Sequence, residues 1–290
     1  MPEWEGVSLW QHGALLNLAG RSDAGRRRSE NQDHFLIADL TPAEGGLLVR
    51  PGAGANASDV AARLSVGERG VLLLVADGMG GAAAGRLASG LASTFIFADL
   101  QEVWLDEPIP LAKRFAQRLK QAVENANRRV QQHALRNPEC TGMGTTATVA
   151  GVLGTRLFLA QVGDSRAYLL RDGQALQLTR DQSLVQQMVD AGAMTAEEAE
   201  RSSHGNVILQ ALGVEAEISV AMTEHDLLPG DVLLLCSDGL YRVIRPEELP
   251  GVVGDGSDPG RACEQLVALA NERGAPDNVT VIIARLESAP

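Results

Sequence analysis

Apolar and polar residues follow one another along the chain in blocks that predict both strands and helices. Continuous apolar runs at 71–76 and 232–236 are typical of strands that are buried on both faces. Apolar side chains at four-residue spacing predict a helix over 82–100 and a clearer amphipathic helix over 111–135. The polar face of this second helix is cationic, which fits either a solvated surface or a docking surface.

A block of strands follows the two helices. The β-branched and aromatic segments 145–150, 156–162 and 166–170 predict strands. The turn sequences Gly163-Asp164-Ser165 and Asp172-Gly173 are expected to join successive strands. Short turns between successive strands predict an antiparallel meander.

The remaining elements are shorter. Residues 181–206 read as helical, with a capping box at Thr195–Glu198, and a last helix has Asp258 as its N-cap and Gly274 just past its end. Because helices come in blocks between antiparallel strands, the pattern predicts an α+β fold and not a doubly wound parallel sheet. Further strands are expected at 14–20, 35–38, 218–222 and 279–284.

The pattern predicts one domain over 14–288, preceded by an irregular lead at 1–13. Residues 41–70 are rich in Gly, Ala, Pro and Ser and separate the first strands from the apolar run that follows. So long a stretch without strong periodicity is unusual inside a compact domain. We therefore expect a surface insertion at 41–70.

Composition narrows the classes of function. The 290 residues carry a formal net charge of -12, which argues against a nucleic-acid or anionic-membrane partner. Arg26–Arg28 is a local cationic exception and predicts an anion site. The three cysteines show no paired spacing, so neither a disulfide framework nor a zinc site is expected. The acidic N-terminus and the lack of a long apolar stretch predict a cytoplasmic protein.

Aspartates recur where the predicted strands begin or end. Asp77 closes the first apolar run and is followed by three glycines within four residues, which fits a metal ligand or a capped Gly-rich turn equally well. The same placement recurs at Asp33, Asp164, Asp238 and Asp277. If these carboxylates converge, their repulsion would be severe without cations among them. Convergence therefore predicts a site for hard cations such as Mg²⁺ or Mn²⁺.

Two such cations would make a hydrolytic centre. They lower the pKa of a shared water, and the hydroxide so formed can attack phosphorus in line. Arg28 can bind phosphate oxygens bidentately and orient the ester. Cys236 and Ser237 adjoin Asp238, but no histidine or helix terminus is evidently placed to activate them as nucleophiles.

The ordered motifs resemble the metal-dependent Ser/Thr protein phosphatases of type 2C. They include VADGMGG at 75–81, VGDSRAYL at 162–169, CSDGL at 236–240 and PDNVT at 276–280, and the full set runs in family order from about 14 to 286. The resemblance implies a central sandwich of two antiparallel sheets with helices on both outer faces.

The resemblance also implies a ligand set for two divalent cations, Mn or Mg. By motif position Asp77 would bridge them, and Gly78 would lend its carbonyl to one. Asp238 and Asp277 would complete the first metal site. Asp33 would serve the second, directly or through water.

The resemblance also implies residues for a third metal site, for phosphate binding and for a flap over the active site. Asp164, with Asp238, matches a third and weaker metal site, and Arg28 takes the phosphate-binding position. Residues 184–206 match the flap that helps choose substrates. Within this flap we single out Gly192, His204 and Asn206.

Two positions depart from the family pattern. Gln32 stands where the family often has Glu, so the second metal is expected to bind more weakly or to depend on Asp33. Met79 stands where many eukaryotic members have a histidine proposed as general acid, which leaves the proton donor open. His34 and His204 are interpreted as packing or surface residues.

The implied function is hydrolysis of phosphoserine and phosphothreonine in proteins, in opposition to a Ser/Thr kinase and by a monomer. One alternative is a pseudophosphatase that binds a phosphoprotein or a regulator without turnover, which would require lost ligands, whereas all the aspartates are present. Another is a metal phosphohydrolase for a small molecule, because substrate choice lies in the flap and the insertion.

Overall fold

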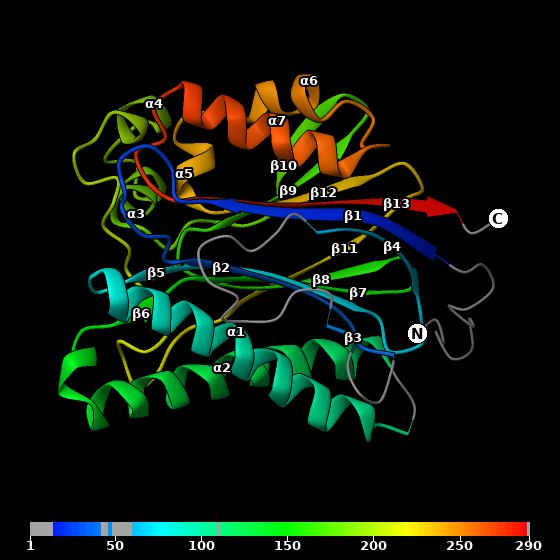
Figure 1. Ribbon diagram of the computed structural model, residues 1–290, viewed down its shortest axis with the longest axis horizontal. Helices are drawn as coiled ribbons and strands as arrows, with labels where there is room; N and C mark the ends of the chain where they lie inside the picture. The colour runs from blue at the N-terminus through cyan, green and yellow to red at the C-terminus, as the bar shows by residue number, and fades with distance from the viewer. Residues whose placement is uncertain (1–13, 42–45, 48–59, 109–110, 289–290) are drawn as a thin grey trace.

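The protein forms a sandwich of two β-sheets between two layers of helices (Figure 1). This computed structural model describes residues 14–41, 46–47, 60–108 and 111–288. The lead expected at 1–13 lies outside the described residues. The α+β class and the two antiparallel sheets flanked by helices are confirmed.

Every strand pair in the first sheet is antiparallel. Its centre is the long pair β1–β13, which joins the two ends of the domain. In spatial order its strands are β10 (Gln174–Gln177), β9 (Arg166–Arg171), β12 (Val232–Cys236), β13 (Val279–Ser288), β1 (Ala14–Asp23) and β4 (Val60–Val66).

The second sheet is also antiparallel throughout. The apolar run at 71–76 lies near its middle, in β5. In spatial order its strands are β11 (Ala221–Asp226), β8 (Arg156–Val162), β7 (Ala147–Leu153), β5 (Val71–Met79), β2 (Asp33–Asp39) and β3 (Gly46–Leu47), with β6 (Gly144–Thr145) paired to the end of β5.

Helices cover both outer faces. The two long helices α1 (Ala82–Leu105) and α2 (Ala112–Arg136) pack on the second sheet, and α7 (Pro259–Glu272) packs on the first (Figure 1). The side chain of Asp258 accepts from the backbone N–H of Arg261, as expected of the N-cap. The shorter helices are α3 (Leu184–Asp190), α4 (Ala196–Glu200), α5 (Asp238–Tyr241) and α6 (Leu249–Val253), and 3₁₀ turns occur at Pro138–Cys140 and Pro246–Glu248.

The apolar residues of β5 explain why the run at 71–76 shows no alternation. Leu72 and Leu74 pack in the layer beneath α1 and α2, whereas Leu73 and Val75 pack between the two sheets. All four side chains are fully buried. A strand in the middle of a four-layer sandwich has no face toward water, so it must be apolar at every position.

The expected meander is wrong at one point. β8 and β9 belong to different sheets, so the turn Gly163–Ser165 carries the chain from one sheet to the other. Gly163 has φ 97°, and a side chain there would lie 2.6 Å from Thr146 Cγ2. A turn sequence shows that the chain reverses, but the strand that follows pairs where its side chains find a buried face. The second turn, Asp172–Gly173, does join the paired strands β9 and β10.

Part of the segment 41–70 is regular. Residues 60–66 form β4, whose side chains alternate between exposed and half-buried, and which pairs with β1 at the edge of the first sheet. Residues 46–47, as β3, and 60–66, as β4, are therefore parts of the two sheets within the segment expected to be a surface insertion. Residues 42–45 and 48–59 lie outside the described part of the chain.

Two other segments differ in their bounds from those expected from the sequence. The helical expectation over 181–206 resolves into α3 and α4, with turns at 201–206, and β11 begins three residues later than expected. The capping box at Thr195 and Glu198 is present at the start of α4.

Candidate metal centre

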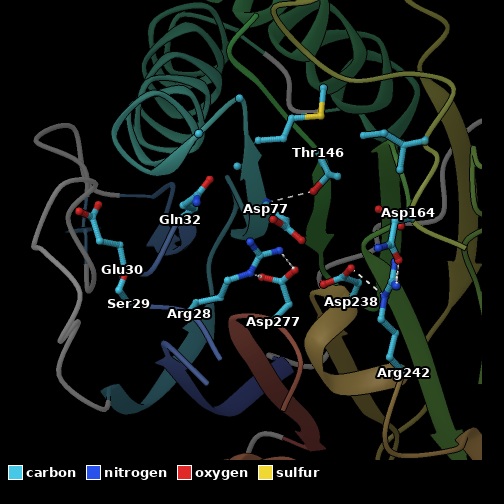
Figure 2. Close-up of a pocket in the computed structure, with 16 residues that line it drawn as sticks. Arg28, Ser29, Glu30, Gln32, Asp77, Thr146, Asp164, Asp238, Arg242 and Asp277 are labelled. Carbon is cyan, nitrogen blue, oxygen red and sulfur yellow. Dashed lines mark hydrogen bonds and ion pairs between the residues drawn. The ribbon is translucent and has the colours of Figure 1, made fainter. Parts of the chain in front are cut away.

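A pocket of about 400 Å³ opens at one end of the sandwich, where ends of strands from both sheets meet. Figure 2 shows carboxylate side chains pointing into it from several elements. Of the residues singled out from the sequence, the pocket is lined by Arg28, Asp77, Gly78, Asp164, Asn206, Asp238 and Asp277. Gly192, His204 and Asp33 are not among its lining residues, but Asp33 is buried and pairs with the lining residue Asp77 in the sheet.

The strand order explains this convergence. Asp33, the first residue of β2, lies opposite Asp77 near the end of β5 in the antiparallel register. Asp238 begins α5 directly after β12, and Asp277 precedes β13, which pairs with β12. Asp164 follows β8 at the crossover between the sheets. Strand exits and entries that are distant in sequence thus share one edge.

The backbone of Asp77 is fixed by two adjacent threonines. Its N–H donates to Thr146 Oγ1 at 3.0 Å, and its carbonyl accepts from Thr145 Oγ1 and from the Thr146 N–H, each at 2.8 Å. Gly78 comes next, and a Cβ at this position would lie 2.1 Å from the carbonyl oxygen of Gly85 in α1. The close approach of α1 therefore requires glycine at 78, whatever its carbonyl binds.

Asp33 and Asp238 each have one carboxylate oxygen in use and one free. Asp33 Oδ2 accepts from Ser237 Oγ at 2.6 Å and from Thr280 Oγ1 at 2.7 Å. Asp238 Oδ2 lies 2.8 Å from Arg242 Nε. Within the described chain, Oδ1 of each aspartate is buried and makes no hydrogen bond. A buried carboxylate oxygen without a partner is costly, so these atoms fit cation ligands.

Burial dominates the electrostatics of the cluster. It raises the pKa of Asp33 and of Asp238 to about 6 and that of Asp164 to about 7. The pKa of Asp77 also lies well above its ordinary value, first because of burial and then because of the negative charges of its neighbours, Asp33 foremost. Each of these shifts shows that the pocket disfavours the accumulated negative charge.

Guanidinium groups hold two of the carboxylates. Arg28 Nε donates to Asp277 Oδ1 at 2.8 Å and its Nη2 to Oδ2 at 2.6 Å, while Arg242 holds Asp238. Over the residues that the structure describes, no three His, Cys, Asp or Glu side chains form a closed ligand cluster. The carboxylates face a shared pocket instead. Oxygen donors on several sides of one space suit hard divalent cations.

Some functional residues were missed from the sequence. Arg242 stands four residues after Asp238, an i,i+4 spacing that could have indicated the ion pair. Tyr241 O–H donates to Asp164 Oδ2 at 3.0 Å, and Arg166 lies over the Tyr241 ring at 3.7 Å. No local pattern pointed to these two contacts, because their partners are distant in sequence.

The flap residues separate into different roles. Asn206 lines the pocket, whereas Gly192 follows the end of α3 with φ 69°, a conformation that suits a glycine at a helix end. His204 is exposed. His34 is partly buried and its Nδ1 lies 2.8 Å from Ser89 Oγ, as expected of a packing residue. Both departures noted in the sequence, Gln32 and Met79, line the pocket.

Comparison with known proteins identifies the family. The family model described as protein phosphatase 2C matches residues 50–272. The Ser/Thr protein phosphatase PstP of Mycobacterium tuberculosis is 35% identical over 270 residues, which cover 93% of this chain. The chain spans only 45% of the length of PstP. Protein phosphatase PhpP of Streptococcus pneumoniae is 36% identical over 216 residues, 74% of this chain and 85% of PhpP.

Solved structures agree. The crystal structure of M. tuberculosis PstP matches with a TM-score of 0.75 at 34% identity and covers 94% of this chain and 99% of that one. A PstP catalytic domain in complex with two manganese ions matches with a TM-score of 0.73 at 34% identity, over 94% and 99% of the two chains. No helix in the described ranges is long and apolar enough to span a bilayer. In sequence and in fold, this chain belongs to the protein phosphatase 2C family.

Proposed function

We propose that this chain is a metal-dependent protein phosphatase that hydrolyses phosphoserine and phosphothreonine. The observation that carries the proposal is one pocket in which buried carboxylates, among them Asp238 with an unpaired Oδ1, lie beside a guanidinium group that can bind phosphate. Relatives named Ser/Thr protein phosphatases support it, as does the PstP structure with two manganese ions.

Two divalent cations, Mn or Mg, would be held by this chain's oxygen donors. When bound, they supply positive charge for the phosphoryl oxygens and a water of lowered pKa. Asp77 would serve both ions and the Gly78 carbonyl one of them, Asp238 and Asp277 would serve the first, and Asp33 the second, directly or through water. Asp164 with Asp238 would serve a third and weaker ion. In this structure Asp164 Oδ2 accepts a hydrogen bond from the Tyr241 hydroxyl, and Asp238 Oδ2 is paired with Arg242.

The protein's own groups orient the reactants. Ser237 and Thr280 fix Asp33 through its Oδ2 and so direct Oδ1 away from them. Arg28 stands half-exposed at the pocket wall, where its fork can bind two oxygens of a phosphate once it releases Asp277. Cys236 is fully buried and burial raises the pKa of its thiol, so it does not serve as a nucleophile.

The proton for the leaving alkoxide comes from solvent in this proposal. Met79 lines the pocket but carries no exchangeable proton, and no histidine is among the described lining residues. The pocket is open to water, so the alkoxide can be protonated without a dedicated side chain.

The proposed substrates are phosphorylated proteins, and the proposed partner is a Ser/Thr kinase whose products this chain dephosphorylates. A monomer in the cytoplasm, with no nucleic acid or membrane partner, completes the proposal. The net charge of -12 supports the absence of polyanionic partners.

Hydrolysis of an aryl phosphate with Mn²⁺ tests the activity, with and without chelator. Asp238→Ala is the test variant, and Asp255→Ala, an exposed aspartate outside the pocket, is its control. We expect turnover by wild type and control that chelation abolishes, and none by Asp238→Ala. Unchanged turnover after chelation or in Asp238→Ala would contradict the metal mechanism.

Two results would favour the alternatives. Confirmed Mn²⁺ binding without any turnover by wild type would favour a pseudophosphatase. Turnover of small phosphate esters with no activity on phosphothreonine peptides would favour a small-molecule phosphohydrolase.

A further inference from the structure

Arg242 connects Asp238 to the flap. Its Nε lies 2.8 Å from Asp238 Oδ2, its Nη1 donates to Asn206 Oδ1, and its Nη2 donates to the Gly205 carbonyl at 3.2 Å. Figure 2 shows its side chain standing beside Asp238 in the pocket wall. All three guanidinium nitrogens are therefore in use, one toward the carboxylate and two toward the turn at 201–206.

The backbone of Arg242 is held by the same short helix that begins at Asp238. Arg242 follows the single turn of α5, and its N–H donates to the Asp238 carbonyl at 3.1 Å. Its side chain is only one quarter exposed. A planar fork held at one nitrogen by a carboxylate presents the other two in a set direction, so it can fix a second segment.

The flap turn has few other attachments to the site. Within 201–206 the Gly205 N–H donates to the Ser202 carbonyl, whereas the residues that follow the turn are bonded to another segment, with the Val207 carbonyl accepting from the Leu184 N–H and the Leu209 N–H donating to the Gln182 carbonyl. Asn206 and Gly205 lie 36 and 37 residues from Arg242 in sequence. The arginine is thus a direct link between the flap turn and a carboxylate of the cluster.

An ion pair that merely neutralises Asp238 would explain only one of the three contacts. The two contacts to the flap do nothing for the charge of Asp238, because both acceptors belong to another segment. Their joint presence means that a shift of the Asp238 carboxylate displaces the guanidinium, and with it the two donors that hold the turn.

We propose that Arg242 is a positioning residue that couples the order of the flap turn 201–206 to the engagement of Asp238, and through it sets the binding of phosphopeptides. The coupling rests on the proposed function, since cation binding is what fixes Asp238. By thermodynamic linkage, a flap held by substrate also favours the bound cation.

Hydrogen exchange of the amides at 202–206, with and without Mn²⁺, tests the coupling. We expect Mn²⁺ to slow this exchange in wild type and in Arg261→Gln, an exposed arginine on α7 that serves as control. In Arg242→Gln the Mn²⁺-dependent protection should fall about tenfold, the size expected for loss of hydrogen bonds to a charged group. Asn206→Ala removes one flap contact but leaves the contact between Arg242 and Asp238 in place. This variant should therefore lose part of the Mn²⁺-dependent protection.

A kinetic ratio supplies the second readout. The ratio of kcat/KM for a phosphothreonine peptide to kcat/KM for an aryl phosphate should fall about tenfold in Arg242→Gln and detectably in Asn206→Ala. Arg242→Lys keeps the positive charge but lacks the planar guanidinium fork. In the hydrogen-exchange experiment it should therefore recover less than half of the Mn²⁺-dependent protection that Arg242→Gln loses. The ratio should stay at the wild-type value in Arg261→Gln.

Calorimetric titration with Mn²⁺ separates the possible failures. If wild type binds Mn²⁺ and the flap amides respond equally in wild type and Arg242→Gln, the coupling is refuted while the proposed function stands. If wild type binds no Mn²⁺, the proposed function fails, and the coupling fails with it.

Discussion

Arg28 and Asp277 form a bidentate ion pair, with Nε at 2.8 Å from Oδ1 and Nη2 at 2.6 Å from Oδ2. The pair joins the residue proposed to bind phosphate to a residue proposed to bind metal. It spans 249 positions of sequence. With the roles proposed above, Arg28 and a divalent cation would compete for the same carboxylate, and a phosphate that draws Arg28 away would make Asp277 available.

Arg28→Ala should weaken substrate binding without weakening cation binding. We expect KM for an aryl phosphate to rise about tenfold or more, because a charged hydrogen-bonding group is lost. The Mn²⁺ affinity should stay equal or increase, because Asp277 loses a competing cation. Steady-state kinetics and calorimetry measure both, with Arg261→Ala, an exposed arginine on α7, as control. A marked loss of Mn²⁺ affinity would contradict the competition.

Asp77→Asn should stabilise the protein in chelator while removing its cation binding. A neutral amide relieves the repulsion from Asp33, Asp238 and Asp164, which all act on the Asp77 carboxylate. We expect the Tm in chelator to rise by about 5 °C. In excess Mn²⁺ the order should reverse, because only the wild type gains stability from the bound ion. A lower Tm for Asp77→Asn in chelator would show that the repulsion is unimportant.

Stability in chelator should fall as the pH rises from about 4 to about 7. Burial raises the pKa of Asp33 and Asp238 to about 6 and of Asp164 to about 7, so the folded state binds more protons than the unfolded state across this range. The free energy of unfolding then decreases with pH and levels off above the highest of these pKa values.

Thermal unfolding between about pH 5 and about pH 7.5 checks this sign. The variant Asp164→Asn, which cannot titrate at this position, should flatten the upper part of the curve, between about pH 6 and 7. Stability that rises through the same range would contradict the raised pKa values.

Thr280→Val and Ser237→Ala should reduce both stability and Mn²⁺ affinity. Each removes one of the two donors to Asp33 Oδ2, and losing a buried donor costs about 1–3 kcal/mol of stability. Loss of such an orienting partner weakens metal binding by about 10–100-fold.

A serine that does not line the pocket provides the matched control. Ser93 is equally buried, and its Oγ donates to the Ser89 carbonyl within α1 at 2.7 Å. Ser93→Ala should leave the Mn²⁺ affinity unchanged. If Ser237→Ala behaves the same way, the hydrogen bond does not orient Asp33.

Much of the architecture was readable from local patterns. The run at 71–76 is apolar at every position because both faces of β5 are covered, and that pattern alone predicted a buried strand. The cap at Asp258 and the capping box at Thr195 act within a few residues of themselves, so their signals survive in the sequence. The edge strand β4 was missed because its seven residues alternate only weakly in polarity.

The sequence by itself determined which residues are available for chemistry: aspartates at strand ends, a guanidinium near Asp33, and an apolar frame to hold them. Tertiary structure decided which of these groups meet. It sent β8 and β9 to different sheets, paired Arg28 with Asp277, and placed Arg242 between Asp238 and the flap. The physical reason is that strand partners and ion pairs are chosen by burial and charge across large sequence separations, and no local window of sequence contains both partners.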